Sequence, residues 1–137
     1  MTNEKLKGVL EQFPDRFWAL VEIAKEDRAA LREALSRMSD DELSRFYWTY
    51  EQAIVELEGP PLLDHVKDVL TEDELRVLSL WIVGQGRDVF VEALTDPSRL
   101  PREARGGCFV LRDIMAEHER RFGEPIPAFD PDDYLMR

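Results

Sequence analysis

An all-α fold, arranged as a single compact domain of about five to seven helices, is predicted by three features of this sequence. Apolar residues recur at helical spacing over most of its 137 residues. Two segments, Ser39 to Glu42 and Thr71 to Glu74, have the pattern of a capping box that opens a helix. No stretch alternates apolar and polar residues as a half-buried strand does, and no internal repeat is found. The length is sufficient to bury a core without metal or disulfide support.

The N-terminal part carries three apolar stripes separated by helix-breaking or charged residues. The first is formed by Leu6, Val9, Leu10 and Phe13 and ends at Pro14. The second and third stripes are separated by the charged residues Lys25 to Arg28. The sequence leaves open whether these two stripes belong to one long helix or to two helices. The members of these two stripes are Phe17, Leu20, Val21 and Ala24, then Leu31, Ala34, Leu35 and Met38.

The helix opened by the Ser39 capping box has the clearest helical period in the chain. Its apolar face consists of Leu43, Phe46, Tyr47, Tyr50, Ala53, Ile54 and Leu57. It is expected to end at Gly59-Pro60-Pro61, because neither proline can continue the hydrogen-bond ladder. A short helix is expected next, with Leu62, Leu63, Val66, Val69 and Leu70.

The helix opened by the Thr71 capping box is expected to be central, since it is apolar around most of its circumference. Leu75, Leu78, Trp81 and Ile82 share one face, which Val77 and Leu80 widen. Gly84 and Gly86 weaken the helix, which therefore either ends or bends there. The period resumes with Val89, Phe90, Ala93 and Leu94 and stops at Asp96-Pro97.

The C-terminal part is predicted to contain a loop, a last helix and a tail. The loop is bracketed by Pro101 and Gly106-Gly107, and the last helix, through Leu111, Ile114, Met115, His118 and Phe122, stops at Gly123. The helical domain is accordingly assigned to residues 1–123. Residues 124–137 form a proline-rich acidic tail, expected to run extended on or near the surface with Phe129 and Tyr134 as anchors.

The amino-acid composition limits which kinds of partner and which cellular location are expected. The net charge of −11 repels phosphates and anionic membrane surfaces, so no nucleic acid and no membrane partner is expected. The single cysteine, Cys108, excludes an internal disulfide, and no apolar segment is long enough for a signal core or a membrane span. A soluble, cytoplasmic protein is the resulting expectation. The charge serves either solubility or attraction to a basic partner.

The run from Trp81 to Arg87, W-I-V-G-Q-G-R, followed by Phe90 and then by A-L-T-D-P, resembles a signature of the DUF4240 family of small bacterial proteins. Phe17-Trp18, the helix start at Asp40 to Glu42 and the segment Glu117 to Glu124 resemble other family elements. The likeness extends over about residues 17–127. The sequence departs from the family pattern in the segment before Trp81. The glycine pair usual in the family is absent, Leu75 replaces a phenylalanine, and Ser79 stands where an arginine is common. The resemblance implies a helical fold and carries no established activity.

The candidate ligand-binding residues are Trp81, Gln85, Arg87 and Asp96. Trp81 and Gln85 are four residues apart, so in a helix they share a face and can line one pocket wall. Gln85 offers both a donor and an acceptor, and the Arg87 fork suits carboxylate or phosphate. The structural alternative is that Trp81 belongs to the core, Gln85 secures a helix end, Arg87 pairs with an acid and Asp96 stops a helix.

No catalytic residue, metal site or cofactor is predicted. His65 and His118 lack a second histidine at metal-binding spacing, and Cys108 has no recognisable base. The first hypothesis is therefore a non-enzymatic binding or regulatory module that recognises a protein or small ligand through the Trp81–Arg87 region. One alternative is an enzyme or small-anion-binding protein that uses the Trp81–Arg87 region; in the enzyme, Arg87 binds an anion and a carboxylate, Asp88 or Asp96, acts as base. Another alternative is an acidic antagonist of a basic protein partner. Oligomeric state is left open.

Overall fold

The computed structural model describes residues 2–129 and 136 and confirms the all-α prediction. Eight α-helices and one short 3-10 helix are found in this described part, which is more than the five to seven α-helices expected. Two breaks, at Asp27 and at Gln85-Gly86, account for the difference, because each divides what could have been one long helix. In order, the helices are α1 Asn3–Leu10, α2 Asp15–Glu26, α3 Arg28–Ser36, α4 Asp40–Leu57, α5 Leu62–Val66, α6 Glu72–Gly84, α7 Arg87–Thr95, η1 Pro97–Arg99 and α8 Val110–Phe122.

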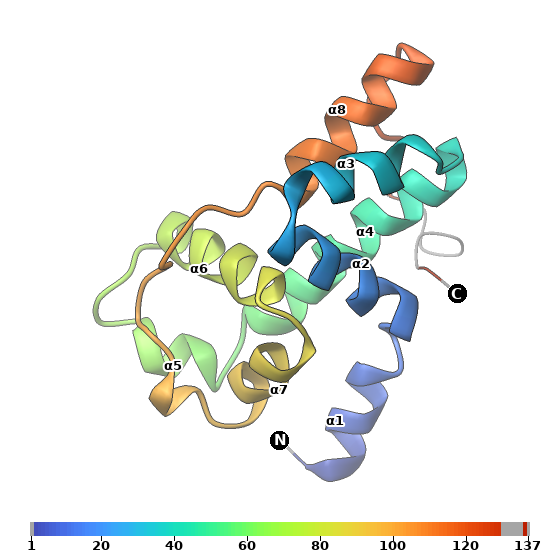
Figure 1. The fold of residues 1–137 in the computed structure, drawn as a ribbon. Helices are drawn as coiled ribbons and strands as arrows, with labels where there is room; N and C mark the ends of the chain where they lie inside the picture. Colours follow the sequence, from blue (N-terminus) through green and yellow to red (C-terminus); the bar gives the residue numbers. More distant parts are fainter. Residues whose placement is uncertain (1, 130–135, 137) are drawn as a thin grey trace.

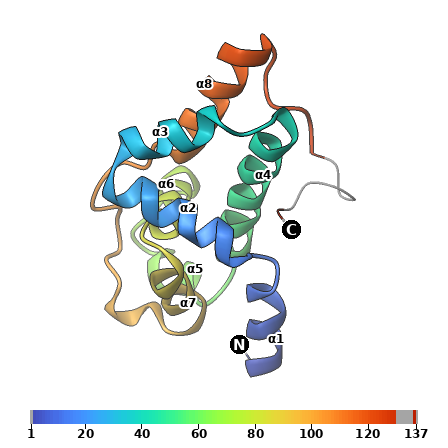
Figure 2. The same ribbon diagram turned by 45° about the vertical axis from the view of Figure 1, so that its right-hand side comes forward.

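The long helix α4 runs through the middle of the molecule and packs against α6, α7 and α8 (Figure 1). Helix α6 lies against α2, α4 and α7, and α3 packs on both α2 and α8. The segment between η1 and α8 passes along the outside of α6 on its way to α8 (Figures 1 and 2). Residues 103–104 of this segment lie near the start of α6, and residues 107–109 lie near its end.

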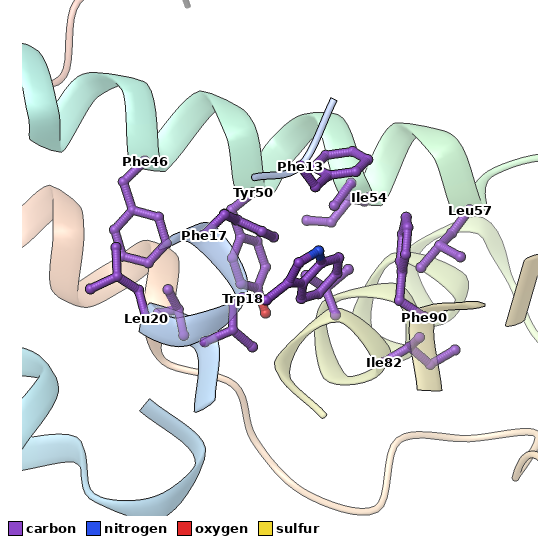
Figure 3. Packing of buried hydrophobic residues seen from close by; sticks show 14 of the residues in the cluster. Phe13, Phe17, Trp18, Leu20, Phe46, Tyr50, Ile54, Leu57, Ile82 and Phe90 are labelled. Carbon is purple, nitrogen blue, oxygen red and sulfur yellow. The ribbon is translucent and has the colours of Figure 1, made fainter. Parts of the chain in front are cut away.

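An aromatic cluster from four elements forms the centre of the core (Figure 3). The ring of Phe90 lies 5.4 Å from that of Phe13 and 5.2 Å from that of Trp18, measured between centroids. Phe17 stands edge-on to Trp18 at 4.8 Å and also contacts Tyr50 of α4. Buried aromatic side chains contribute large apolar areas, so this cluster supplies much of the force that holds α2, α4 and α7 together.

Both predicted capping boxes are confirmed. The Ser39 Oγ accepts from the Glu42 amide at 3.1 Å, and Glu42 Oε1 accepts from the Ser39 amide at 3.2 Å. Thr71 and Glu74 make the same reciprocal pair at the start of α6. A salt bridge from Arg16 is the main reason that the pKa of Glu42 lies below its ordinary value, and the Thr71 amide lowers the pKa of Glu74. Both carboxylates therefore remain ionised near neutral pH.

The buried face of α6 is narrower than its apolar pattern predicts. Leu78, Ile82 and Val83 are fully buried, together with Ser79. In contrast Val77, expected to widen the buried face, is 53% exposed. Among the described residues, no helix combines the length and apolarity required to cross a membrane.

The residues after α8 contact the helical part at several points. Gly123 ends α8 with φ +69°, and the buried His118 contacts the Glu124 carbonyl through Nδ1 at 2.7 Å. Its Nε2 meets Asp40 Oδ1, at the start of α4, at 2.5 Å. Trp48 Nε1 donates to the Pro127 carbonyl at 3.0 Å. The expected anchor Phe129 packs on Trp48, with centroids 5.6 Å apart. The other expected anchor, Tyr134, lies outside the described residues.

Candidate functional site

The turn between α6 and α7 is built around Gly86. Its φ of +110° with ψ of 179° is a backbone conformation that only glycine adopts readily. A Cβ atom at this position would lie 2.2 Å from Glu22 Oε1 of α2. The turn therefore ends α6 and restarts the chain as α7 while its backbone lies directly against α2. Gln85 is held at the last turn of α6 by a bond from its amide to the Trp81 carbonyl at 3.1 Å.

A pocket of about 310 Å³ opens beside this turn. Four segments meet there: the end of α2, the start of α3, the end of α6 and the stretch that leads into α8. The lining residues are Ala24, Lys25, Arg28, Leu31, Trp81, Gly84, Gln85, Gly107, Cys108, Phe109, Val110 and Asp113. The volume lies at the lower end of the range of small-molecule sites.

Hydrogen-bonding groups gather on one side of this pocket. Lys25 Nζ donates to the Gln85 carbonyl at 3.2 Å, which uses one of the three N–H donors of the ammonium group. Gln85 is half-buried, and its side-chain amide, unlike its backbone amide, makes no hydrogen bond to the described residues. Trp81 is also half-buried and presents part of its indole to the pocket. The pocket thus offers unused donors beside a flat apolar surface.

The lining also contains an ion pair whose acidic partner is buried. Arg28 donates to both carboxylate oxygens of Asp113, at 2.9 and 2.8 Å, and its guanidinium lies 4.3 Å from the centre of the Phe109 ring. The Asp113 side chain is 4% exposed, whereas that of Arg28 is 41% exposed. Arg32 adds a second positive charge 3.8 Å from Asp113. These contacts raise the pKa of Arg28, mainly through the hydrogen bonds to Asp113.

The thiol of Cys108 lies 2.9 Å from the hydroxyl of the fully buried Tyr50. That hydroxyl donates its proton to the Leu80 carbonyl at 2.8 Å. Since a hydroxyl has only one proton, its oxygen is left to accept from the Cys108 S–H. Gly84 allows this arrangement, because a Cβ there would lie 3.3 Å from both the thiol sulfur and the hydroxyl oxygen.

The four residues expected from the sequence occupy different places. Trp81 and Gln85 line the pocket together, whereas Arg87 and Asp96 are not among its lining residues. Arg87 is exposed at the first position of α7 and makes no ion pair to the described residues. Asp96 caps η1 by accepting from the Ser98 amide at 3.2 Å. Hydrogen bonds from Ser98 are the main reason that the pKa of Asp96 is lowered.

Three charged lining residues were missed by the sequence reasoning. Lys25 and Arg28 fall in the charged run taken only as a separator between two stripes, and Asp113 lies in the last amphipathic helix. A buried position for Asp113 could have been suspected, because in a helix it lies one turn after the apolar Val110 on the same face. Its arginine partner is 85 positions away, however, and no local pattern indicates such a pair.

The two histidines have structural partners. His65 Nε2 lies 3.1 Å from the Leu100 carbonyl, and His118 bridges Asp40 and Glu124 as described above. Within residues 2–129 and 136, no group of three or more histidine, cysteine, aspartate or glutamate side chains is arranged to hold a metal ion.

The fold and the pocket define a small all-α domain with a polar-walled cavity where helices α2, α3, α6 and α8 meet. The chain belongs to the DUF4240 family, described as "Protein of unknown function", whose model matches residues 14–119. The resemblance carried by the Trp81–Arg87 run is thereby confirmed, and all lining residues fall within the match. No curated protein and no solved structure matches the chain.

Proposed function

We propose that this protein is a binding module whose pocket takes a small molecule with a flat apolar part and a carboxylate group. The observation that carries the proposal is the convergence of Trp81, Gln85 and Lys25 on one pocket of about 310 Å³. Sites of this kind combine an apolar surface with a few polar groups that fix the orientation of the ligand. The half-buried indole supplies the first feature, and the unused N–H groups of Gln85 and Lys25 supply the second.

The electrostatic balance of the pocket favours an anionic group. Its lining contains the cations Lys25 and Arg28 and the single carboxylate Asp113. The guanidinium of Arg32 lies 3.8 Å from the Asp113 carboxylate and adds a further positive charge near the pocket. The pocket is thus locally positive in a chain of net charge −11. A carboxylate that bound Lys25 and Gln85 would gain charge-assisted hydrogen bonds, which are stronger than neutral ones.

Binding is favoured over catalysis because the reactive groups of the pocket are already engaged. Both oxygens of Asp113 accept from Arg28, so this carboxylate is poorly placed to remove a proton from a ligand. The Cys108 thiol donates to the Tyr50 oxygen and has no imidazole beside it among the described residues. Asp96, with its lowered pKa and its role as a cap, is a weak base outside the pocket.

A thermal-shift screen tests the proposal. The full chain would be heated with benzoate, phenylacetate, indole-3-carboxylate and nicotinate, each compared with its uncharged amide. A ligand that binds only the folded state raises the melting temperature, and the shift grows with the logarithm of the ligand concentration once this exceeds Kd. We expect a shift with at least one carboxylate and a smaller shift with its amide. The absence of a shift with all four acids would contradict the proposed ligand class.

Three variants locate the site. Lys25→Ala and Gln85→Ala each remove a donor, and calorimetric titration should show a weakening of about tenfold, the usual effect of losing one charge-assisted hydrogen bond. Arg87→Ala is the matched control, since it removes a neighbouring cation that does not line the pocket. If Arg87→Ala weakened binding equally, the ligand would bind nearer to α7 than proposed. If Lys25→Ala and Gln85→Ala both bound the ligand unchanged, the ligand would not bind in this pocket.

A further inference from the structure

A second depression lies at the other end of α6 and shares no lining residue with the pocket. It has a volume of about 300 Å³ and forms where the segment after η1 crosses the start of the helix. Its lining residues are Leu70, Asp73, Glu74, Val77, Glu103 and Ala104, which we call the acidic groove. In Figure 1 this region lies at the left, where the loop before α6 approaches the chain that leads to α8.

The acidic groove has an apolar floor that other parts of the described chain do not cover. Val77 is 53% exposed, and the half-buried Leu70 lies beside it in the lining. Val69, which precedes Leu70, is 51% exposed. Single exposed apolar residues are common on protein surfaces. Here Leu70 and Val77 lie together in a concave site lined by carboxylates, where one partner side chain can cover both. Covering Val77 and Leu70 would remove apolar area from water and stabilise a complex.

The charged residues that line the acidic groove are all acidic, and the exposed Arg102 and Arg105, next to Glu103 and Ala104 along the chain, are not among the lining residues. Asp73, Glu74 and Glu103 line the groove, and no lysine or arginine does so. Glu74 is oriented by its bond from the Thr71 amide, which also lowers its pKa and keeps it ionised. The nearest cation along α6, Arg76, is engaged with Glu51 at 2.8 Å. Three carboxylates around an apolar floor attract a partner that carries positive charge on both sides of an apolar side chain.

We propose that the acidic groove docks a basic segment of a protein partner. One aliphatic or aromatic side chain of that segment enters over Leu70 and Val77, and flanking lysines or arginines pair with Asp73 and Glu103. A second copy of this chain is a poor occupant, because bringing two molecules of charge −11 together on an acidic face adds repulsion. The same repulsion disfavours nucleic acids and anionic membranes.

Selection from a random peptide library displayed on phage, with the immobilised full chain as bait, tests this proposal. We expect the enriched peptides to share an apolar residue flanked by lysine or arginine. A synthetic peptide with that consensus should bind more weakly as salt is raised, since exposed charge pairs are screened. Failure to enrich peptides, or a consensus without basic residues, would overturn the proposal.

Variants assign the binding to the acidic groove. Asp73→Lys combined with Glu103→Lys should weaken the consensus peptide by at least about tenfold, and Val77→Ser should weaken it by a few-fold through lost apolar contact. Glu4→Lys combined with Glu119→Lys is the matched control: it changes net charge equally at exposed sites on α1 and α8. Equal weakening in the control would show attraction to overall charge only. Dimerisation in sedimentation that Val77→Ser abolishes would identify a second copy as the occupant, and would also overturn the proposal.

Discussion

The guanidinium of Arg28 holds both carboxylate oxygens of Asp113, at 2.9 and 2.8 Å, and so ties the start of α3 to the first turn of α8. The carboxylate side chain is 4% exposed, so the hydrogen bonds from Arg28 replace those that water would otherwise make to it. The ring of Phe109 lies against the guanidinium at 4.3 Å and shields the pair on one side. One wall of the pocket therefore depends on a contact between segments that are distant along the chain.

Removing the acid should destabilise the fold. Asp113→Ala is expected to lower the free energy of unfolding by roughly 1–3 kcal/mol, because two charge-assisted hydrogen bonds at a buried carboxylate are lost. Urea denaturation followed by circular dichroism measures the change. Asp88→Ala is the matched control, since Asp88 is also an acid in the first turn of a helix but is exposed. Similar losses in both variants would mean that the ion pair contributes little.

Gly86 should tolerate no side chain. Gly86→Ala is expected to cost roughly 1–3 kcal/mol because φ is +110°, whereas the exposed Glu22 side chain can rotate away from the added Cβ. The double variant Gly86→Ala/Glu22→Ala should therefore recover little of the loss. Gly8→Ala provides the contrast, since no atom lies near it within α1 and alanine favours helix. A neutral Gly86→Ala would contradict the turn geometry.

Stability at high pH should depend on Tyr50. Burial, together with the neighbouring Cys108, raises the pKa of Tyr50 well above its ordinary value of 10.0. A raised pKa in the folded state means that the stabilising contribution is complete below pH 10.0 and is lost as the pH rises further. Tyr50→Phe should lower stability by roughly 1–2 kcal/mol at neutral pH, because the Leu80 carbonyl loses its donor.

The difference between wild type and Tyr50→Phe should then shrink above pH 10.0, where only the wild type has a buried hydroxyl to ionise. Urea midpoints measured from neutral pH upward give this difference directly. Tyr47→Phe serves as the comparison, since Tyr47 is only partly buried and should show a weaker trend. A constant difference over the whole range would refute the assignment to Tyr50.

The division into a helical domain of residues 1–123 and a tail of residues 124–137 remains a prediction that truncation can test. A chain ending at Gly123 is expected to keep its helical circular dichroism but to lose roughly 2–4 kcal/mol, because about three hydrogen bonds disappear. The lost bonds are those of the Glu124 carbonyl with His118, the Pro127 carbonyl with Trp48 and the Met136 amide with Thr49. An unfolded truncated chain would place the tail inside the domain.

Most of the helices follow from local chemistry, which is why they could be predicted. A capping box is a contact between residues three positions apart, and the boxes at Ser39 and Thr71 open α4 and α6 as expected. Gly86 interrupts the helix at the expected position, and Gly123 ends α8. The pairing of Trp81 with Gln85 in one pocket wall follows from helical spacing in the same way.

Only the tertiary structure decided which other side chains complete the site. Lys25, Arg28 and Asp113 reach the pocket from three separate helices, and the exposure of Val77 depends on which neighbours cover α6. Such contacts are set by how amphipathic helices pack against one another, and many packings satisfy the same periodic pattern. The sequence by itself thus determined the capped starts of α4 and α6, several helix ends, and the placement of Trp81 and Gln85 on one pocket wall. It left open the breaks at Asp27 and at Gln85-Gly86. The charged residues that join Trp81 and Gln85 in the pocket were brought there by long-range packing, which no local pattern encodes.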